Sequence, residues 1–285
     1  MKLKNQATNK QALAFIGGGH MATSLIGGLI ANGYDAQAIW VADPDQSKLD
    51  RLYHHFGINT TLDNFQAAQK AEVVVLAVKP QQIKTASIAL KQLATPSQPL
   101  WISIAAGIRI SDLEYWLGCS APILRAMPNT PALVQAGATA LFASPQTTSQ
   151  QRQLAESILR AVGMTLWLSS EHLMEAVTAL SGGGPAYFFL VMEAMEKAAI
   201  HLGLDPDSAR LLTLETALGA AKMALESKED TTSLRRQVTS PGGTTERAIA
   251  TLEKFGIHQA FADALEAARN RTQELAKELG ATHDR

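Results

Sequence analysis

The sequence predicts an α/β fold with a doubly wound, mostly parallel sheet, followed by an all-α C-terminal domain. Up to about residue 168, short apolar runs alternate with amphipathic segments, as in the βα units that build a parallel sheet. After that residue the strand-like runs stop, and the composition turns to Ala, Leu, Met and Glu in segments of helix length. We therefore expect a Rossmann domain over residues 1–168 and a helical domain over residues 169–285.

The first domain is expected to alternate strands and helices regularly. Residues 13–16 form the first predicted strand, and residues 21–31 form a helix with its apolar side chains on one side. The uninterrupted apolar run at 73–78 is typical of a strand that helices cover on both faces. Further strands are predicted at 39–42, 100–105 and 122–127, and a further helix at 46–56.

In the second domain, apolar residues recur at spacings of three and four. The pattern predicts helices over 185–203, from 206 onward, and over 258–279. About 115 residues make a modest core by themselves, so we expect some apolar stripes to be buried in a partner subunit of a homo-oligomer. The alternative is that these stripes pack only on each other.

Composition narrows the range of partners. Lys and Arg number 25 against 26 for Asp and Glu, so no charge excess favours a nucleic acid or an anionic membrane. No stretch approaches the roughly 20 apolar residues of a membrane span. Cys119 is the single cysteine, which fits a reducing compartment. Residues 1–10 are polar, lack the apolar core of a signal peptide and are expected to be a loose extension. We expect a cytoplasmic protein.

No metal site is predicted. Surface or capping roles suit the histidines better, because none has the spacing of metal ligands. Six of the seven histidines are meant, all but His20 of the Gly-rich turn: His54, His55, His172, His201, His258 and His283.

A Gly-rich turn follows the first predicted strand and opens the first helix. Gly17, Gly19 and the small Ala22 match a dinucleotide fingerprint, in which glycines let the backbone approach a pyrophosphate at a helix N-terminus. His20 and Met21 begin that helix and would offer backbone N–H groups. A merely structural turn is the alternative.

Asp43 ends the second predicted strand, where a carboxylate commonly binds the ribose 2′-hydroxyl. This position leans slightly toward NADH, since a carboxylate repels the 2′-phosphate of NADPH. However, Asp43 also lies in an ordinary turn, and Ser47 and Lys48 are close enough to offset its charge. The expected cofactor is NADPH or NADH.

Two further strand ends are expected to border the cofactor. Ligands of open α/β sheets bind beyond the carboxyl ends of the strands. Val78, Lys79 and Pro80 follow the long apolar run, and Ala105 ends the next strand. Lys79 could equally be a solvated loop lysine, and Pro80 a helix starter.

Another segment suited to a ligand lies in the helical domain. Residues 240–245, Ser-Pro-Gly-Gly-Thr-Thr, run into a helical pattern and present N–H groups and hydroxyls at a helix N-terminus, where a small anion can bind. A helix cap is the alternative. With the Gly-rich turn, this segment points to a cofactor-dependent enzyme that acts on a small acid.

Five motifs together closely resemble the Δ1-pyrroline-5-carboxylate reductase family. The resemblance covers roughly residues 12–279, with the motifs in family order, and 240–245 is the most specific of them. Two departures stand out: Gly183, where the family more often has Ser, and the pair Asp43-Pro44, where many relatives carry residues more favourable to a 2′-phosphate. The motifs are the Gly-rich turn, residues 78–80, 125–131, 181–187 and 240–245.

The resemblance implies reduction of the cyclic imine of pyrroline-5-carboxylate with NAD(P)H, giving L-proline. It also implies a Rossmann domain followed by a helical domain that dimerises by intertwining, often into larger rings, with an active site formed from both subunits. Met127-Pro128-Asn129 resembles the nicotinamide-side loop, with Asn129 as a cofactor contact and Met127 as either a contact or core packing.

The chemistry suits residues 240–245, which contain no strong acid or base. An imine nitrogen can enter already protonated, whereas a carbonyl would need a Lys, His or Tyr acid. With the resemblance, Ser240 and the N–H groups of Gly243 and Thr244 are expected to bind the substrate carboxylate. Thr245 is expected to bind the substrate through a hydrogen bond to the ring nitrogen. It is also the expected catalytic residue, which could relay the proton of that nitrogen.

Three alternatives stay open. One is a related cyclic imine acid as substrate. Another is a β-hydroxyacid dehydrogenase, which would need a catalytic lysine such as Lys197 or Lys222, although both lie in surface-like helical patterns. The third is a sensor or scaffold that binds NAD(P) without turnover.

Overall fold

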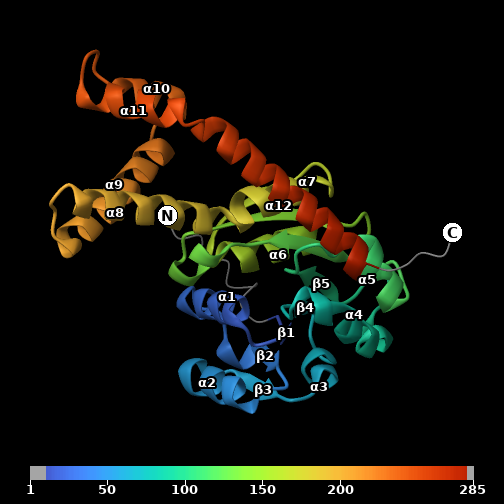
Figure 1. Ribbon diagram of the computed structural model, residues 1–285. Helices are drawn as coiled ribbons and strands as arrows, with labels where there is room; N and C mark the ends of the chain where they lie inside the picture. The colour runs from blue at the N-terminus through green and yellow to red at the C-terminus, as the bar shows by residue number, and fades with distance from the viewer. Residues whose placement is uncertain (1–10, 281–285) are drawn as a thin grey trace. The chain divides into compact units, whose positions relative to one another are not determined.

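The computed structural model describes residues 11–280, and Figure 1 shows its ribbon. The expected extension at residues 1–10 and the side chain of His283 lie outside the described residues. The chain divides into two compact units, one formed by residues up to Gly183 together with those from Ala268 on, the other by Gly184–Ala267. The expected boundary at 168/169 follows the last strand. The division at Gly183 also assigns α7 (Leu173–Val177) and the end of the last helix to the first unit.

The first unit is built on an eight-stranded sheet with the order β3-β2-β1-β4-β5-β6-β7-β8. Neighbouring strands are parallel except for β6 and β7, which confirms the predicted fold class. Ile16 is level with Ala42 and Leu76, so the carboxyl ends of β2, β1 and β4 meet at one edge of the sheet. The strands are β1 Leu13–Ile16, β2 Ile39–Ala42, β3 Asn59–Thr61, β4 Val73–Leu76, β5 Leu100–Ser103, β6 Ile123–Met127, β7 Gly137–Ala143 and β8 Gly163–Trp167.

Helices cover both faces of this sheet. Successive residues of a strand point to opposite faces, so Leu13 and Phe15 join one buried apolar cluster while Ala14 and Ile16 join the other. The first cluster contains residues of α1 (His20–Ala31), α2 (Gln46–Phe56) and α6 (Ser149–Arg160). The second contains residues of α3 (Asn64–Ala68), α4 (Pro80–Ala89) and α5 (Ile110–Leu117). Short 3₁₀ turns lie at Ala36–Ala38, Lys91–Leu93 and Thr130–Val134, and a π-helical turn at Thr178–Gly182.

Two predicted strands are longer than the observed ones. The strands expected at 73–78 and 100–105 end two residues earlier, at Leu76 and Ser103. The last ladder hydrogen bonds run from the N–H of Ala77 to the carbonyl of Ile16 at 2.8 Å and from the N–H of Ile104 to the carbonyl of Leu76 at 3.3 Å. The predicted strands and helix at 13–16, 39–42 and 46–56 have the observed bounds.

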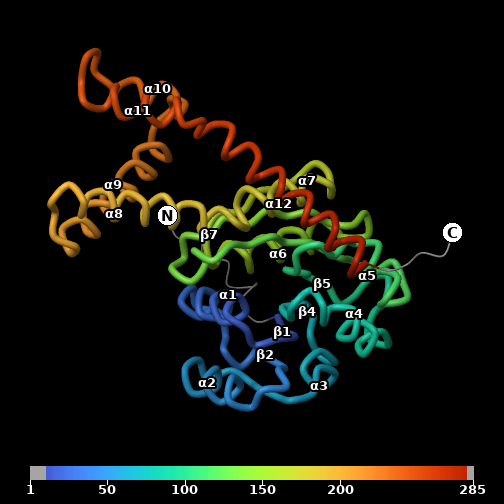
Figure 2. Tube along the Cα trace, in the orientation of Figure 1, coloured from blue at the N-terminus to red at the C-terminus, as the bar shows by residue number. Residues whose placement is uncertain are grey.

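The second unit is helical. Its helices are α8 (Gly184–His201), α9 (Pro206–Glu226), α10 (Thr231–Gln237), α11 (Thr244–Lys254) and the first part of α12 (Ile257–Leu279), and Figure 2 traces the chain through them. Asp205 caps α9 by accepting from the N–H of Ser208 at 3.0 Å, and Asp230 caps α10 from Ser233 at 2.8 Å.

Most apolar side chains of α8 and α9 are uncovered in the single chain. Helix α8 buries only Gly184, and α9 buries only Ala209 and Thr213. A monomer rarely exposes an apolar surface of this extent, so the two helices have the character of a face that another chain covers. The exposed large apolar residues on them are Phe188, Phe189, Leu190, Val191, Met195, Ile200, Leu211, Leu212, Leu214, Leu218, Met223 and Leu225.

Candidate active site

The turn between β1 and α1 can be formed only by glycine at its first position. Gly17 has a φ of 104°, and a Cβ added to it would lie 2.7 Å from the carbonyl oxygen of Ala77. Its N–H donates to the carbonyl of Ala42 at 2.7 Å. Gly17 is therefore held tightly where the carboxyl ends of β1, β2 and β4 meet.

Gly19 serves a different purpose, because a Cβ added there would meet no atom within 4 Å. It is the N-cap of α1, and no side chain caps this helix end and no acidic residue lies in its first turn. Among residues 11–280, no protein group accepts from the N–H groups of His20 and Met21. The helix end is thus open to an anion, and the space at Gly19 lets that anion approach the backbone closely.

A cleft of about 640 Å³ lies beside this helix end. It brings the predicted Gly19, His20 and Lys79 together with Lys48 and Arg51, two residues outside the predicted cofactor contacts. A signal was available, because the lysine and arginine lie three residues apart on a helix that starts just after Asp43. The full lining is Gly18, Gly19, His20, Thr23, Lys48, Arg51, Leu52, His55, Phe56 and Lys79.

Asp43 is buried next to the Gly-rich turn, with 5% of its surface exposed. Its Oδ2 accepts from the N–H of Gly18 at 2.9 Å and its Oδ1 from the N–H of Asp45 at 3.0 Å. Lys48 Nζ lies 3.2 and 3.3 Å from the same two oxygens. The carboxylate therefore fixes the Gly-rich turn to the start of α2 and is neutralised by a lysine.

The residues after β4 and β5 lie near the turn without lining the cleft, except for Lys79. Val78 packs beside Gly17, and Pro80 is the first residue of α4, whose N-cap is Lys79. Ala105 is 7% exposed and follows β5. Their small or apolar character leaves room for a cofactor, and their contact with it stays a prediction.

Two polar side chains of residues 125–131 hold backbone elements together. Asn129 accepts from the N–H of Ala138 at 2.9 Å and donates to the carbonyl of Ser181 at 3.1 Å, which leaves one amide hydrogen for a ligand. Arg125, 8% exposed, pairs with Glu171 at 2.8 Å, and the same carboxylate oxygen accepts from the N–H of Ile110 at 2.8 Å. Both residues therefore have a clear structural role in the first unit.

In the second unit, the predicted anion-binding segment lies between α10 and α11 (Figure 2). The N–H of Gly243 donates to the carbonyl of Ser240 at 3.0 Å, and Glu246 accepts from the N–H of Gly242 at 2.7 Å. These two N–H groups are thus used inside the loop. The available donors begin one residue later, at the exposed Thr244 and Thr245.

Thr244 and Thr245 are the first two residues of α11. Among residues 11–280, no protein group accepts from their N–H groups, and their hydroxyls have no hydrogen-bond partner. A helix N-terminus with two open N–H groups and two hydroxyls can hold a carboxylate and one further polar atom. This arrangement supports the predicted site, with Gly243 shaping the loop rather than donating.

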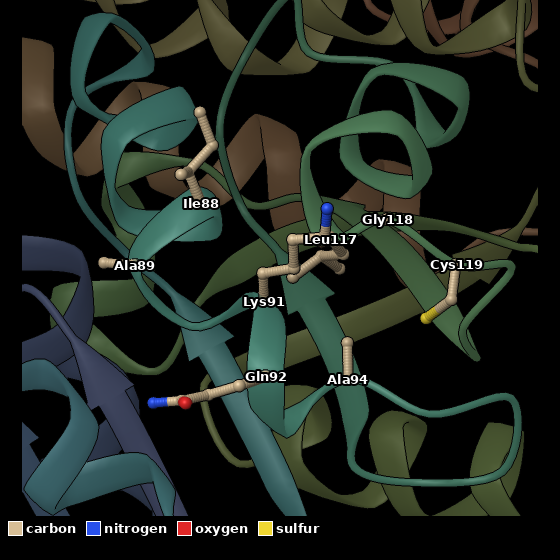
Figure 3. A pocket seen from close by; sticks show the side chains of 8 residues that line it. All are labelled: Ile88, Ala89, Lys91, Gln92, Ala94, Leu117, Gly118 and Cys119. Carbon is tan, nitrogen blue, oxygen red and sulfur yellow. The ribbon is translucent and has the colours of Figure 1, made fainter.

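Another cavity, of about 470 Å³, has no residue in common with either site and lies between the end of α4 and the end of α5 (Figure 3). Lys91 lies over Gly118 at its edge, and Cys119 lines it. Burial, followed by the nearby charge of Glu114, raises the pKa of the Cys119 thiol. The thiol is therefore a poor nucleophile at neutral pH.

The comparisons with known proteins cover nearly the whole chain. A pyrroline-5-carboxylate reductase from Pseudomonas aeruginosa is 49% identical over 94% of this chain and 98% of its own length. This chain belongs to the pyrroline-5-carboxylate reductase family. The family model described as pyrroline-5-carboxylate reductase dimerisation matches residues 171–275, and the model described as NADP oxidoreductase, coenzyme F420-dependent, matches residues 12–107.

Solved structures of pyrroline-5-carboxylate reductases have the same fold. The enzyme from Coxiella burnetii is 51% identical, with a TM-score of 0.89 over 96% of this chain and all of that one. The Plasmodium falciparum pyrroline carboxylate reductase, solved with NADP bound, is 28% identical, with a TM-score of 0.84 over 94% of this chain and 99% of that one. With the uncovered faces of α8 and α9, the dimerisation model supports a homo-oligomer.

Other features of the described residues bear on the remaining alternatives. Lys197 and Lys222 are 73% and 71% exposed, and each faces a glutamate on its own helix. Within residues 11–280, no group of three or more His, Cys, Asp or Glu side chains is placed to hold a metal ion. None of the helices in this range has the length and apolar character needed to cross a membrane.

Proposed function

We propose that this chain reduces L-Δ1-pyrroline-5-carboxylate to L-proline with NADPH or NADH, the last step of proline biosynthesis. The observation that carries the proposal is the open N-terminus of α11, where Thr244 and Thr245 offer N–H groups and hydroxyls but no strong acid. This donor set suits a small imine carboxylic acid. Membership of the family adds the identity of the imine.

The residues around the Gly-rich turn fit a dinucleotide. The open N–H groups of His20 and Met21 would hold the pyrophosphate, and the empty space at Gly19 is a cradle that a Cβ would fill. Val78, Lys79, Pro80, Ala105 and Asn129 are the proposed contacts around the rest of the cofactor. When bound, the reduced nicotinamide supplies a hydride.

Residues 240–245 bind the pyrroline ring of the substrate and orient it. In the proposal, the N–H groups of Thr244 and Thr245 hold the carboxylate, with Ser240 and Gly243 shaping the loop beside it. The Thr245 hydroxyl hydrogen-bonds the ring nitrogen and keeps its proton on that nitrogen. Because the protonated imine needs no further acid, positioning supplies most of the rate acceleration, for which well-oriented reactants can contribute about 7–11 kcal/mol.

The proposed assembly is a homodimer or a larger homo-oligomer formed through the helical part. The exposed apolar side chains of α8 and α9 give such an interface enough apolar surface. We assign cofactor binding to residues 1–168 and substrate binding with dimerisation to residues 169–285. We propose the cytoplasm as the compartment and no nucleic-acid or membrane partner.

The direct test follows nicotinamide absorbance with pyrroline-5-carboxylate, run separately with NADPH and NADH. Proline formation and matching consumption of reduced cofactor are expected. Faster turnover of a related cyclic imine acid would identify that acid as the substrate instead. Oxidation of a β-hydroxy acid without imine reduction, or cofactor binding without any turnover, would overturn the proposal.

A further inference from the structure

We propose that Lys48 sets the cofactor preference of this chain toward NADPH. In this proposal Lys48 covers the buried Asp43 carboxylate and, with Arg51, forms a cationic site for the 2′-phosphate. The inference rests on the proposed function only in that the cleft beside the Gly-rich turn binds a nicotinamide dinucleotide.

Asp43 is unsuited to binding a ribose hydroxyl. With 5% of its surface exposed, it accepts from the N–H groups of Gly18 and Asp45 at 2.9 and 3.0 Å. Lys48 Nζ contacts both oxygens at 3.2 and 3.3 Å. A carboxylate that discriminates for NADH must present its charge to the 2′-hydroxyl, and here a lysine lies over it.

The cleft has a positive charge. Its lining carries Lys48, Arg51 and Lys79 with the histidines His20 and His55, and it includes no carboxylate. A 2′-phosphate brings about −1.5 to −2 charges and several acceptor oxygens, which a lysine and an arginine bind well.

Two acidic groups stand just outside the lining: Asp43 pairs with Lys48, and Asp45 is engaged as the cap of α2. Asp45 Oδ1 accepts from the N–H of Ser47 at 2.9 Å and from the Ser47 hydroxyl at 2.6 Å. The cap fixes the start of α2, whose first two turns carry Lys48 and Arg51. Asp45 therefore places the two cations without lining the cleft itself.

Both Lys48 and Arg51 have N–H groups left for a ligand. The Lys48 side chain is 38% exposed and has three donors, so the ammonium can contact both Asp43 and a phosphate. Within residues 11–280, Arg51 donates only from Nε, to the carbonyl of Ser47 at 3.3 Å, so its terminal nitrogens remain available to a ligand. With NADH bound, Asp43 is the counter-charge of Lys48, whereas the 2′-phosphate of NADPH supplies a second counter-charge that Lys48 and Arg51 can share.

The test measures dissociation constants for NADPH and NADH by fluorescence titration of the purified chain, without substrate. Wild-type protein is expected to bind NADPH at least about tenfold more tightly, the effect of a single charge-assisted hydrogen bond or more. Lys48→Met should weaken NADPH binding and strengthen NADH binding, because it removes one cation and uncovers Asp43. Arg51→Met should weaken NADPH binding alone.

The control is Lys84→Met, on α4 and outside the cleft, which should change neither constant. If Lys48→Met does not fold, the double variant with Asp43→Asn removes the uncovered carboxylate, and Arg51→Met tests the phosphate site independently. Equal affinities in the wild type, or an unchanged NADPH/NADH ratio in both cation variants, would overturn the inference. NADPH-selective binding without reduction of pyrroline-5-carboxylate would overturn the proposed function and leave this inference standing.

Discussion

In the proposed chemistry, the Thr245 hydroxyl hydrogen-bonds the ring nitrogen of the substrate. It is the second residue of α11, and its hydroxyl makes no hydrogen bond within residues 11–280. We expect Thr245→Val to lower kcat by at least about tenfold, the effect of one hydrogen bond to a charged group, with NADPH affinity unchanged. Steady-state kinetics and a cofactor titration check this. The matched control Thr251→Val, on the same helix, should retain kcat, and an unchanged kcat in a folded Thr245 variant would remove the residue from the mechanism.

Gly17 and Gly19 should respond differently to the same added methyl group. Gly17→Ala places a Cβ 2.7 Å from the carbonyl of Ala77 in a left-handed conformation, so the melting temperature without cofactor should fall. Gly19→Ala meets open space, so its melting temperature should stay close to that of the wild type, while NADPH affinity falls by about tenfold or more. Thermal unfolding with and without NADPH separates the two effects. Full NADPH affinity in Gly19→Ala would contradict the proposed pyrophosphate cradle.

The Gly-rich turn, Lys79 and the open end of α11 were predictable from the sequence because local backbone chemistry determines them. The sequence placed Lys48 close to Asp43, but the burial of the carboxylate was not predictable, because it depends on how α2 packs beside the Gly-rich turn. The internal hydrogen bond of Gly243 to Ser240 is likewise a detail of turn geometry that residue types leave open.

At the scale of elements, α6 and β8 are joined by a polar cluster around Glu156. Its carboxylate accepts from Trp167 Nε1 at 3.0 Å and from Thr165 Oγ1 at 3.1 Å, and Arg160 lies at 2.8 Å. These hydrogen bonds, that of Trp167 foremost, lower the pKa of Glu156. Burial, with the charge of Glu171 second, raises the pKa of Glu114 on α5.

The opposite shifts predict opposite effects of the Glu→Gln substitution. A lowered folded-state pKa stabilises the fold above the ordinary glutamate pKa, and this contribution is lost as the pH falls through the folded-state value. Glu156→Gln should therefore lower the melting temperature at pH 7, with the deficit narrowing below about pH 4.

Glu114→Gln should raise the melting temperature at pH 7, and its gain should vanish as the pH falls below the ordinary glutamate range. Melting curves across that range at one protein concentration test both, and a deficit of Glu156→Gln that is independent of pH would contradict the assignment.

Three strands escaped prediction for physical reasons. The residues of β3 (Asn-Thr-Thr) are polar and half-buried at the sheet edge, so they carry no apolar signal. In β7, Ala and Gly replace large apolar residues, and β8 alternates so that Met164 and Leu166 are exposed. The strands buried on both faces were predictable because a short, continuous apolar run between helical patterns is typical of a strand covered by helices.

For the whole molecule, the uncovered apolar faces of α8 and α9 predict an oligomer whose loss costs activity. Phe189 is 64% exposed, and Phe189→Asp should reduce the mass in sedimentation velocity and lower kcat, because a charge placed in an apolar interface disfavours association. Leu62→Asp, 59% exposed in the first unit, is the matched control and should keep the mass of the wild type. A monomeric wild type at micromolar concentration, or an unchanged mass for Phe189→Asp, would contradict the prediction. The sequence predicts a partner subunit, but it does not show which side chains face it. The structure identifies them as the exposed apolar side chains of α8 and α9.

The most direct measurement is a crystal structure of the assembled protein with L-proline and NADP⁺ bound. The account predicts the proline carboxylate within hydrogen-bond distance of the N–H groups of Thr244 and Thr245, and the ring nitrogen near the Thr245 hydroxyl. Proline bound at another place, with the start of α11 empty or covered by protein, would contradict it.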